Sequence, residues 1–215
     1  MPTILIQNRS GASGKIYNVF SEQPGVSGGG VQATRPVVWY QTNPIANNAQ
    51  AVFRFAPDVY GFVGSTNQPS SQLPDGDDVY LQGAQVLRVG TILNDGTRLM
   101  VDKSLNITAV DNTAPNHTVD ILTKTEVQSA NRNVVGIARL QEGESMPAPV
   151  AVVELKPGVD FSFTPKYGVF ISSTQYSQGT IQGLAQHSAK VEFTGAQKTA
   201  VVVEKSDGQF SVDYK

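Results

Sequence analysis

Residue types that catalyse reactions or bind metals are scarce in this chain of 215 residues. It has no cysteine, which excludes thiol nucleophiles, thiolate metal sites and iron–sulfur clusters. Only two histidines occur, His117 and His187, so a metal site with three histidine ligands is excluded as well. Neither stands near a Gly-x-Ser-x-Gly motif, which would present a nucleophilic serine. We expect both histidines to be exposed or structural. The sequence predicts no catalytic residue, no metal ligand and no cofactor.

One acidic segment, Asp75-Gly76-Asp77-Asp78, resembles a fragment of a calcium-binding loop, because it gathers hard oxygen ligands in a short stretch. A complete loop also needs regularly spaced ligands and a distal glutamate, and both are missing here. A solvated surface turn is therefore the better interpretation.

Two polar loops suggest a different chemistry, the recognition of hydroxyl groups. Segments 67–78 and 175–183 are rich in Asn, Gln and Ser, and tyrosines stand in or beside them. Aromatic rings stack on the apolar faces of sugars, while side-chain amides hydrogen-bond their hydroxyls. The sequence therefore predicts a surface that binds a neutral carbohydrate or small molecule, formed by Tyr60, Asn67, Gln68, Tyr167, Gln175, Tyr176 and Gln178.

Each of these loops follows a motif that occurs twice. Residues 53–66 read Phe-Arg-Phe-Ala-Pro-Asp-Val-Tyr-Gly-Phe-Val-Gly-Ser-Thr, and residues 161–174 read Phe-Ser-Phe-Thr-Pro-Lys-Tyr-Gly-Val-Phe-Ile-Ser-Ser-Thr. Phenylalanines at i and i+2 share one face of a strand, whereas proline has no N–H to give to a ladder. We expect the strand to end, bend or lie at a sheet edge at Pro57, and a bend at Pro165.

Short matches continue beyond the motif at nearly the same offset. Gly83-Ala84-Gln85 corresponds to Gly195-Ala196-Gln197, Asp95-Gly96 to Asp207-Gly208, and Val101-Asp102 to Val212-Asp213. Asp-Gly between strands supplies the positive φ angles of a tight hairpin turn. These matches predict a tandem pseudo-twofold duplication with about 107 residues in each half. The two repeats, residues 1–107 and 108–215, are expected to be closely packed or fused into one body.

Composition indicates an all-β fold. Valine, threonine and aromatic residues recur throughout, and 20 glycines and 12 prolines are spread along the chain, as in many short strands joined by turns. An antiparallel β-sandwich or barrel is the predicted architecture. Its first two strands, Thr3–Gln7 and Lys15–Ser21, are expected to form a hairpin.

The charge of the chain and its lack of targeting signals bear on its partners and its location in the cell. Sixteen basic and eighteen acidic residues give a net charge of −2 without a basic cluster, so we expect no nucleic-acid partner. No apolar run approaches the ~20 residues of a membrane span, and no membrane association is predicted. The absence of cysteine and of a signal-peptide pattern at the N-terminus favours the cytoplasm.

The leading hypothesis is a non-catalytic, lectin-like binding protein for a neutral carbohydrate or small molecule. A cofactor-free isomerase or cyclase that uses a β-barrel cavity is one alternative. A self-assembling structural protein is the other, and homo-oligomers are compatible with the sequence. Whether the chain is an enzyme stays open at this stage, although the lack of catalytic groupings argues against it.

Overall fold

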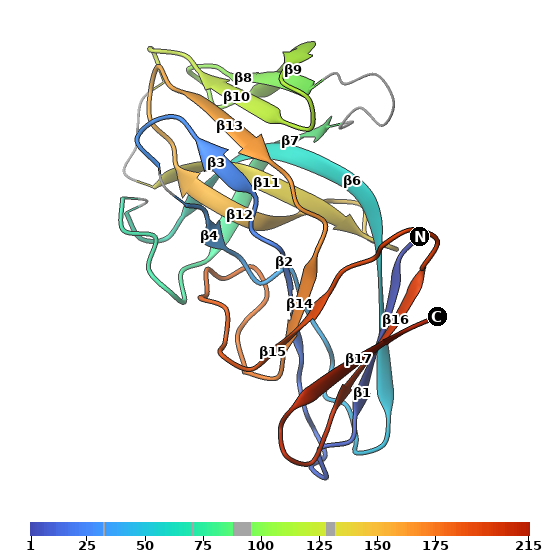
Figure 1. Ribbon diagram of the computed structural model, residues 1–215. Coiled ribbons are helices and arrows are strands. Elements are labelled where there is room, and N and C mark those ends of the chain that lie inside the picture. Colours follow the sequence, from blue (N-terminus) through green and yellow to red (C-terminus); the bar gives the residue numbers. More distant parts are fainter. Residues whose placement is uncertain (32, 70, 88–95, 128–131) are drawn as a thin grey trace.

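The computed structural model describes residues 1–31, 33–69, 71–87, 96–127 and 132–215. Within these ranges the chain forms strands and no helix, which confirms the all-β prediction. The strands build three curled sheets that together resemble a half-barrel (Figure 1). No helix in the described ranges has the length and apolarity that a membrane span requires.

The largest sheet has eight strands and is organised around one long strand, β6 (Gln50–Thr66). The first part of β6 pairs with β1 (Thr3–Asn8), and the second part pairs with β11 (Asn133–Gln141) and β7 (Val79–Leu87). β1 also pairs in parallel with β16 (Thr199–Glu204), so strands near the two chain ends are neighbours. The sheet is completed by β17 (Phe210–Tyr214), β12 (Ala148–Glu154) and β4 (Arg35–Pro36).

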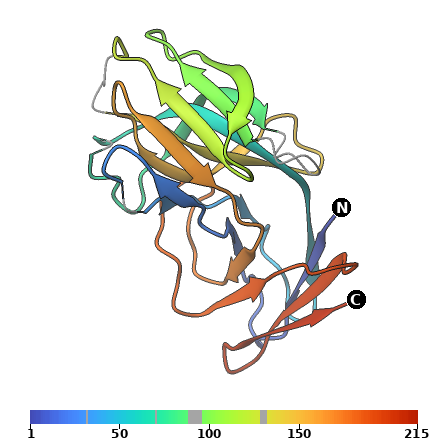
Figure 2. The same cartoon turned by 45° about the horizontal axis from the view of Figure 1, so that its top comes forward.

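Two smaller sheets cover different parts of this one. The five-stranded sheet lies at the end of the molecule away from β17 (Figure 2) and has the order β3 (Gly25–Ser27), β13 (Asp160–Thr164), β10 (Val119–Thr123), β8 (Gly96–Val101) and β9 (Ile107–Ala114). The four-stranded sheet has the order β15 (Ser188–Val191), β14 (Val169–Ser172), β2 (Asn18–Ser21) and β5 (Tyr40–Gln41). Most pairings are antiparallel, but β1 with β16 and β8 with β10 are parallel.

The predicted hairpin between Thr3–Gln7 and Lys15–Ser21 is wrong. β1 is flanked by β6 and β16, while β2 pairs with β14 and β5 in a different sheet. A central position between two strands buries Ile4 and Ile6 completely. That burial outweighs the proximity of the two segments in the sequence.

The core is divided by β11, which is covered on both faces. The main cluster includes Val135 and Ile137, and a smaller cluster on the opposite face includes Val134 and Ala138. This alternation follows the period of two along a strand. Arg139 continues the series of Val135 and Ile137, so its side chain enters the main core rather than solvent.

The first copy of the repeated motif lies within β6, which runs without interruption through Pro57. Arg139 of β11 pairs with Val59, and Gln141 pairs with Phe55, so β6 carries extra residues at this point of the ladder. This register shift absorbs the missing N–H of Pro57. Of the outcomes expected at Pro57, an end of the strand is wrong, and an irregularity inside one continuous strand accommodates the proline.

The second copy is divided between two sheets. Phe161 and Phe163 lie in β13 of the five-stranded sheet, Pro165 lies in the connection, and the apolar run forms β14 of the four-stranded sheet. The matching triplets also differ: Gly83 lies within β7, whereas Gly195 lies in a turn with φ +64°. Asp95 lies outside the described residues. The duplication stays a prediction, because the two copies of the motif lie in different sheets and pair with different strands.

Every sheet combines strands from residues 1–107 with strands from residues 108–215. In the largest sheet β1 pairs with β16, and β6 pairs with β11. In the smaller sheets β3 pairs with β13, and β2 pairs with β14. The core is consequently shared between the two ranges.

Candidate functional site

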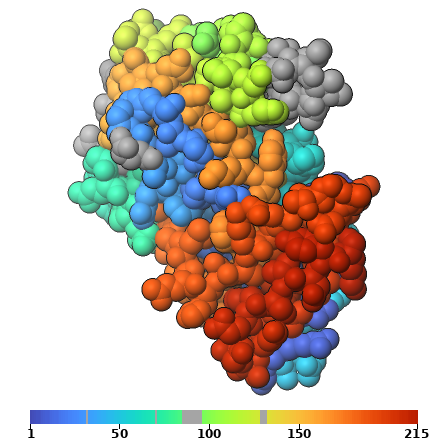
Figure 3. Space-filling view, in the orientation of Figure 1, coloured from blue at the N-terminus to red at the C-terminus, as the bar shows by residue number. Residues whose placement is uncertain are grey.

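A hollow in the described part of the structure lies between the segment 173–190 and the β16–β17 hairpin. It consists of two adjoining pockets of about 500 and 260 Å³ that share Gln186, His187, Gly208 and Gln209. We call this feature the β15–β17 groove. The residues from segment 173–190 and the hairpin form the orange and red lower part of the surface in Figure 3. The remaining lining residues are Ser173, Thr174, Tyr176, Ala185, Ser188, Ala189, Lys190, Glu204, Asp207, Phe210 and Val212.

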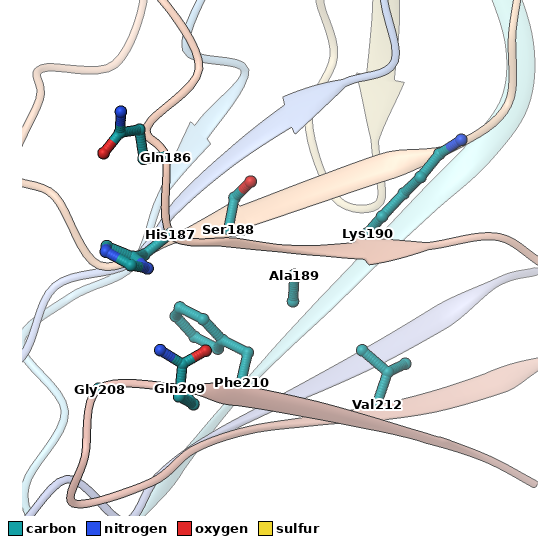
Figure 4. Close-up of a pocket in the computed structure, with 9 residues that line it drawn as sticks. All are labelled: Gln186, His187, Ser188, Ala189, Lys190, Gly208, Gln209, Phe210 and Val212. Carbon is teal, nitrogen blue, oxygen red and sulfur yellow. The ribbon is translucent and has the colours of Figure 1, made fainter.

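The groove exists because two edge strands face each other without pairing. β15 is the edge of the four-stranded sheet and β17 is the edge of the eight-stranded sheet. Figure 4 shows the side chains of Ala189, Phe210 and Val212 in the gap between them, with His187 at the end nearest Gly208. The floor is therefore apolar, and the open end is polar.

The hairpin turn that shapes this end was predicted from Asp207-Gly208. Gly208 has φ +78°, the left-handed conformation that glycine adopts without strain. Its N–H donates to the carbonyl of Lys205 at 2.9 Å, and the N–H of Gln209 donates to the Asp207 carboxylate at 2.9 Å. The turn is confirmed, and it places Gln209 beside the groove.

A buried carboxylate lies at the base of the larger pocket. Glu204 is 2% exposed and accepts hydrogen bonds from Tyr17 Oη (2.6 Å), Lys15 Nζ (3.0 Å) and Ser173 Oγ (2.9 Å). Burial raises the pKa of the Tyr17 phenol, and its hydrogen bond to Glu204 and the charge of that carboxylate raise it further. Tyr17 therefore remains a proton donor, and the charge of Glu204 is balanced by Lys15.

Several polar side chains of the groove have no hydrogen-bond partner among the described residues. The side chains of Gln186, His187 and Gln209 form no hydrogen bond or ion pair within the described part of the chain. By contrast, Ser173 is held by Glu204. No described serine is hydrogen-bonded to His187, and the described residues contain no group of three or more potential metal ligands. The free amides and imidazole are suited to hydrogen-bonding an incoming polar molecule.

The two polar loops that the sequence singled out lie side by side. Val79 N–H donates to the Gly179 carbonyl at 3.0 Å, and Gly76 N–H donates to the Ile181 carbonyl at 2.7 Å. Tyr176 alone of the predicted site residues lines the β15–β17 groove. Its ring packs edge-on against Phe20, with 6.3 Å between ring centres.

Other predicted residues from these loops serve the loops themselves or point elsewhere. The backbone N–H groups of Asn67 and Gln68 donate to the buried carboxylate of Asp77 at 3.2 and 3.0 Å. The Asn67 side chain donates to Asp78 at 3.0 Å. Two further residues of the second loop, Gln175 and Gln178, are exposed outside the groove. The acidic segment thus acts as a structural turn.

Tyr60 and Tyr167 are not part of the groove either. Tyr60 is half-buried against the smaller core cluster, and burial together with the nearby Asp58 raises the pKa of its phenol. The ring of Tyr167 is 50% exposed and lies 5.9 Å from the guanidinium carbon of Arg139. The predicted set therefore does not converge on one surface.

Sequence reasoning missed Glu204 and Arg139 and gave no role to His187. Glu204 ends the apolar run Ala200–Val203, and Arg139 ends the run Val134–Ala138. A charged residue directly after an apolar run, within the same strand, is the signal that could have found them.

The comparisons with known proteins give no family for this chain. No protein-family model, curated protein or solved structure matches it. The functional argument therefore depends on the geometry of the site.

Proposed function

We propose that the β15–β17 groove binds a neutral carbohydrate or a related polyol without transforming it. The observation that supports this most directly is the set of free side chains Gln186, His187 and Gln209 above the apolar floor of Phe210. Amides and imidazole match sugar hydroxyls, and aromatic surfaces match the C–H faces of a sugar ring. Because Glu204 is already paired with Lys15, the groove presents no unpaired buried charge to a neutral ligand.

Calorimetric titration with a panel of neutral oligosaccharides tests this proposal. Replacing Gln186 or Gln209 by alanine should weaken binding by about 3- to 10-fold, the loss expected for one hydrogen bond. Gln178→Ala is the matched control, because Gln178 is an exposed glutamine of the same segment, 173–190, but does not line the groove. The proposal is wrong if no sugar binds, or if Gln178→Ala weakens binding as much as Gln209→Ala.

The alternative of an enzyme is tested on the same samples. Proton NMR of each bound sugar after prolonged incubation should show only the starting material, and it would also detect an isomer of the same mass. New products that disappear with His187→Ala would favour the isomerase or cyclase alternative over simple binding.

Self-assembly is the second candidate, and the unpaired edges of β15 and β17 favour it. Open edge strands can pair with another chain. Light scattering after size exclusion tests this. A single monomeric species up to high concentration would contradict assembly.

The duplication and the cytoplasmic location also stay proposals. The paired short matches support the duplication, and the absence of cysteine supports a reducing compartment. Expression of residues 1–107 and 108–215 as separate chains tests independence of the repeats: since every sheet is shared, neither should fold alone. Cell fractionation of the full chain tests the location.

A further inference from the structure

Arg139 is an unusual residue in the core, and it lies away from the β15–β17 groove. Its side chain enters the main core from β11 and is 1% exposed. Arginine is almost never fully buried without a partner, because removal of its charge from water costs several kcal/mol. A buried guanidinium therefore calls for a compensating group.

Aromatic rings supply part of the compensation. The guanidinium carbon lies 4.9 Å from the ring centre of Trp39, 4.8 Å from that of Phe55 and 5.9 Å from that of Tyr167. Cations are attracted to the faces of such rings. Phe55 belongs to the first repeated motif and Tyr167 to the second, so the two motifs meet around this cation.

Hydrogen bonding is largely missing. Nη1 of Arg139 donates to Ser21 Oγ at 3.4 Å, whereas Nε and Nη2 have no partner among the described residues. No described carboxylate lies within 4.0 Å of the guanidinium. Glu22 lines the same small cavity, but its carboxylate is paired with Lys190 at 3.2 Å and Lys166 at 3.9 Å.

The charge itself persists at neutral pH. Burial lowers the pKa of Arg139 to about 10, which still leaves the guanidinium protonated near pH 7. Among the described residues, the core thus contains a cation with free N–H donors and no paired anion.

A cavity of about 10 Å³ adjoins this cation. Arg139 and its partner Ser21 form part of the wall, and the other lining residues are Glu22, Pro24, Val59, Ile137, Val150, Pro165 and Lys166. This volume accommodates one particle the size of a water molecule. It is too small for a phosphate or a carboxylate-bearing molecule. A monatomic anion is a single sphere larger than water, and the cavity can take it only because one side opens toward solvent.

We propose that this cavity binds one halide ion, held by the unpaired N–H groups of Arg139. Chloride is the most available such ion in a cell. A water molecule could accept the same hydrogen bonds, but it would leave the guanidinium charge without a counter-ion, whereas a halide satisfies both. Lys166 and Glu22, which form an ion pair, both line the cavity and offset each other, so Arg139 supplies the unbalanced positive charge.

The single tryptophan provides a reporter in the unmodified protein. Trp39 is fully buried and lies 4.9 Å from the guanidinium, so bromide in the cavity should quench its fluorescence through the heavy-atom effect. Bromide added at constant ionic strength against sulfate should quench Trp39 saturably, and chloride should reverse the quenching. Quenching that is linear in bromide and unaffected by chloride would overturn the proposal.

Crystals grown without halide and soaked in bromide give a second test on the same chain. An anomalous peak beside Arg139 is expected. A feature at this place without anomalous signal would identify a bound water and overturn the proposal.

Variants then assign the binding to Arg139. Arg139→Met should raise the dissociation constant for bromide, measured from the quenching curve, by about 10- to 100-fold. This is the loss expected when a hydrogen bond to a charged group is removed. Arg54→Met is the matched control, since Arg54 is 54% exposed and paired with Glu142. Equal weakening in both variants would show a general charge effect instead of a site.

Discussion

Two buried charges in this protein are stabilised in opposite ways. Glu204 and Arg139 each follow an apolar run in a strand, and each is at most 2% exposed. Glu204 accepts three hydrogen bonds, one of them from the ammonium group of Lys15. Arg139 has one weak hydrogen bond and lies among aromatic rings. A charge can therefore be buried by a complete polar network or by an incomplete aromatic cage, and the two differ in what their removal should cost.

Loss of the carboxylate should cause the largest loss of stability. Glu204→Gln leaves Lys15, which is 30% exposed, without its counter-ion, and we expect the free energy of unfolding to fall by about 1.5–3 kcal/mol, the value of hydrogen bonds to a charged group. Urea denaturation measures the change. Glu144→Gln, at an exposed glutamate, is the control and should change stability by less than about 0.5 kcal/mol. A small loss for Glu204→Gln would mean that the network does not hold the carboxylate.

Loss of the cation should behave differently. In halide-free buffer, Arg139→Met replaces an unpaired buried charge by an apolar side chain of similar length, which should leave stability unchanged or raise it by up to about 4 kcal/mol. Urea denaturation of Arg139→Met and of Glu204→Gln measures both changes in the free energy of unfolding and shows whether they differ as expected. A loss as large as that of Glu204→Gln would show that Arg139 is fully compensated in the native state.

High pH should act on the two regions in opposite directions. The pKa of Tyr17, beside Glu204, is raised in the folded state, so the folded protein keeps a proton that the unfolded chain loses. The contribution of Tyr17 to the free energy of unfolding therefore falls as the pH rises above about 10. The pKa of Arg139 is lowered to about 10, so the folded protein loses a proton that the unfolded chain keeps, and this contribution rises with pH.

Variants separate these two contributions. Above about pH 10, the free energy of unfolding should fall less steeply with Tyr17→Phe than in the wild type, and more steeply with Arg139→Met. Each slope should change by at most about 1.4 kcal/mol per pH unit. Denaturation curves at successive alkaline pH values measure the slopes. If Tyr17→Phe gives a slope parallel to that of the wild type, the proposed role of its phenol is wrong.

The smallest expected effect concerns the exposed wall of the aromatic cage. Tyr167→Ala should lower the free energy of unfolding by about 0.5–1 kcal/mol through the lost contact with Arg139. A double-mutant cycle with Arg139→Met isolates this coupling. Tyr80→Ala, at a tyrosine that is 49% exposed, is the matched control and should show no coupling with Arg139. Zero coupling for Tyr167 would mean that Trp39 and Phe55 alone face the cation.

The candidate site shows how far the sequence leads. The second polar loop was found, and its Tyr176 does line the groove. The first loop is as polar as the sequence predicted, but its polar groups form hydrogen bonds within the loop. Asp77 accepts hydrogen bonds from the N–H groups of Asn67 and Gln68. Composition indicates that a loop is polar. It does not indicate whether its donors and acceptors are already paired.

The repeated motif gives the same lesson for the fold. Its phenylalanines were expected to share one face of a strand, and Phe53, Phe55, Phe161 and Phe163 are all buried. Their copies nevertheless lie in different sheets, because one motif pairs along β6 and the other is split between β13 and β14. The contact of both motifs with Arg139 is visible only in three dimensions.

The sequence by itself determined the strand class and the turn at Asp207-Gly208, because β-branched patterning and glycine's conformational freedom act over a few residues. The tertiary structure decided that β1 pairs with β16, that β15 and β17 leave a groove between them, and that Lys15 reaches Glu204 across 189 residues of chain. Such pairings are selected by the total burial of the assembled sheets, and no local stretch of the sequence contains that quantity.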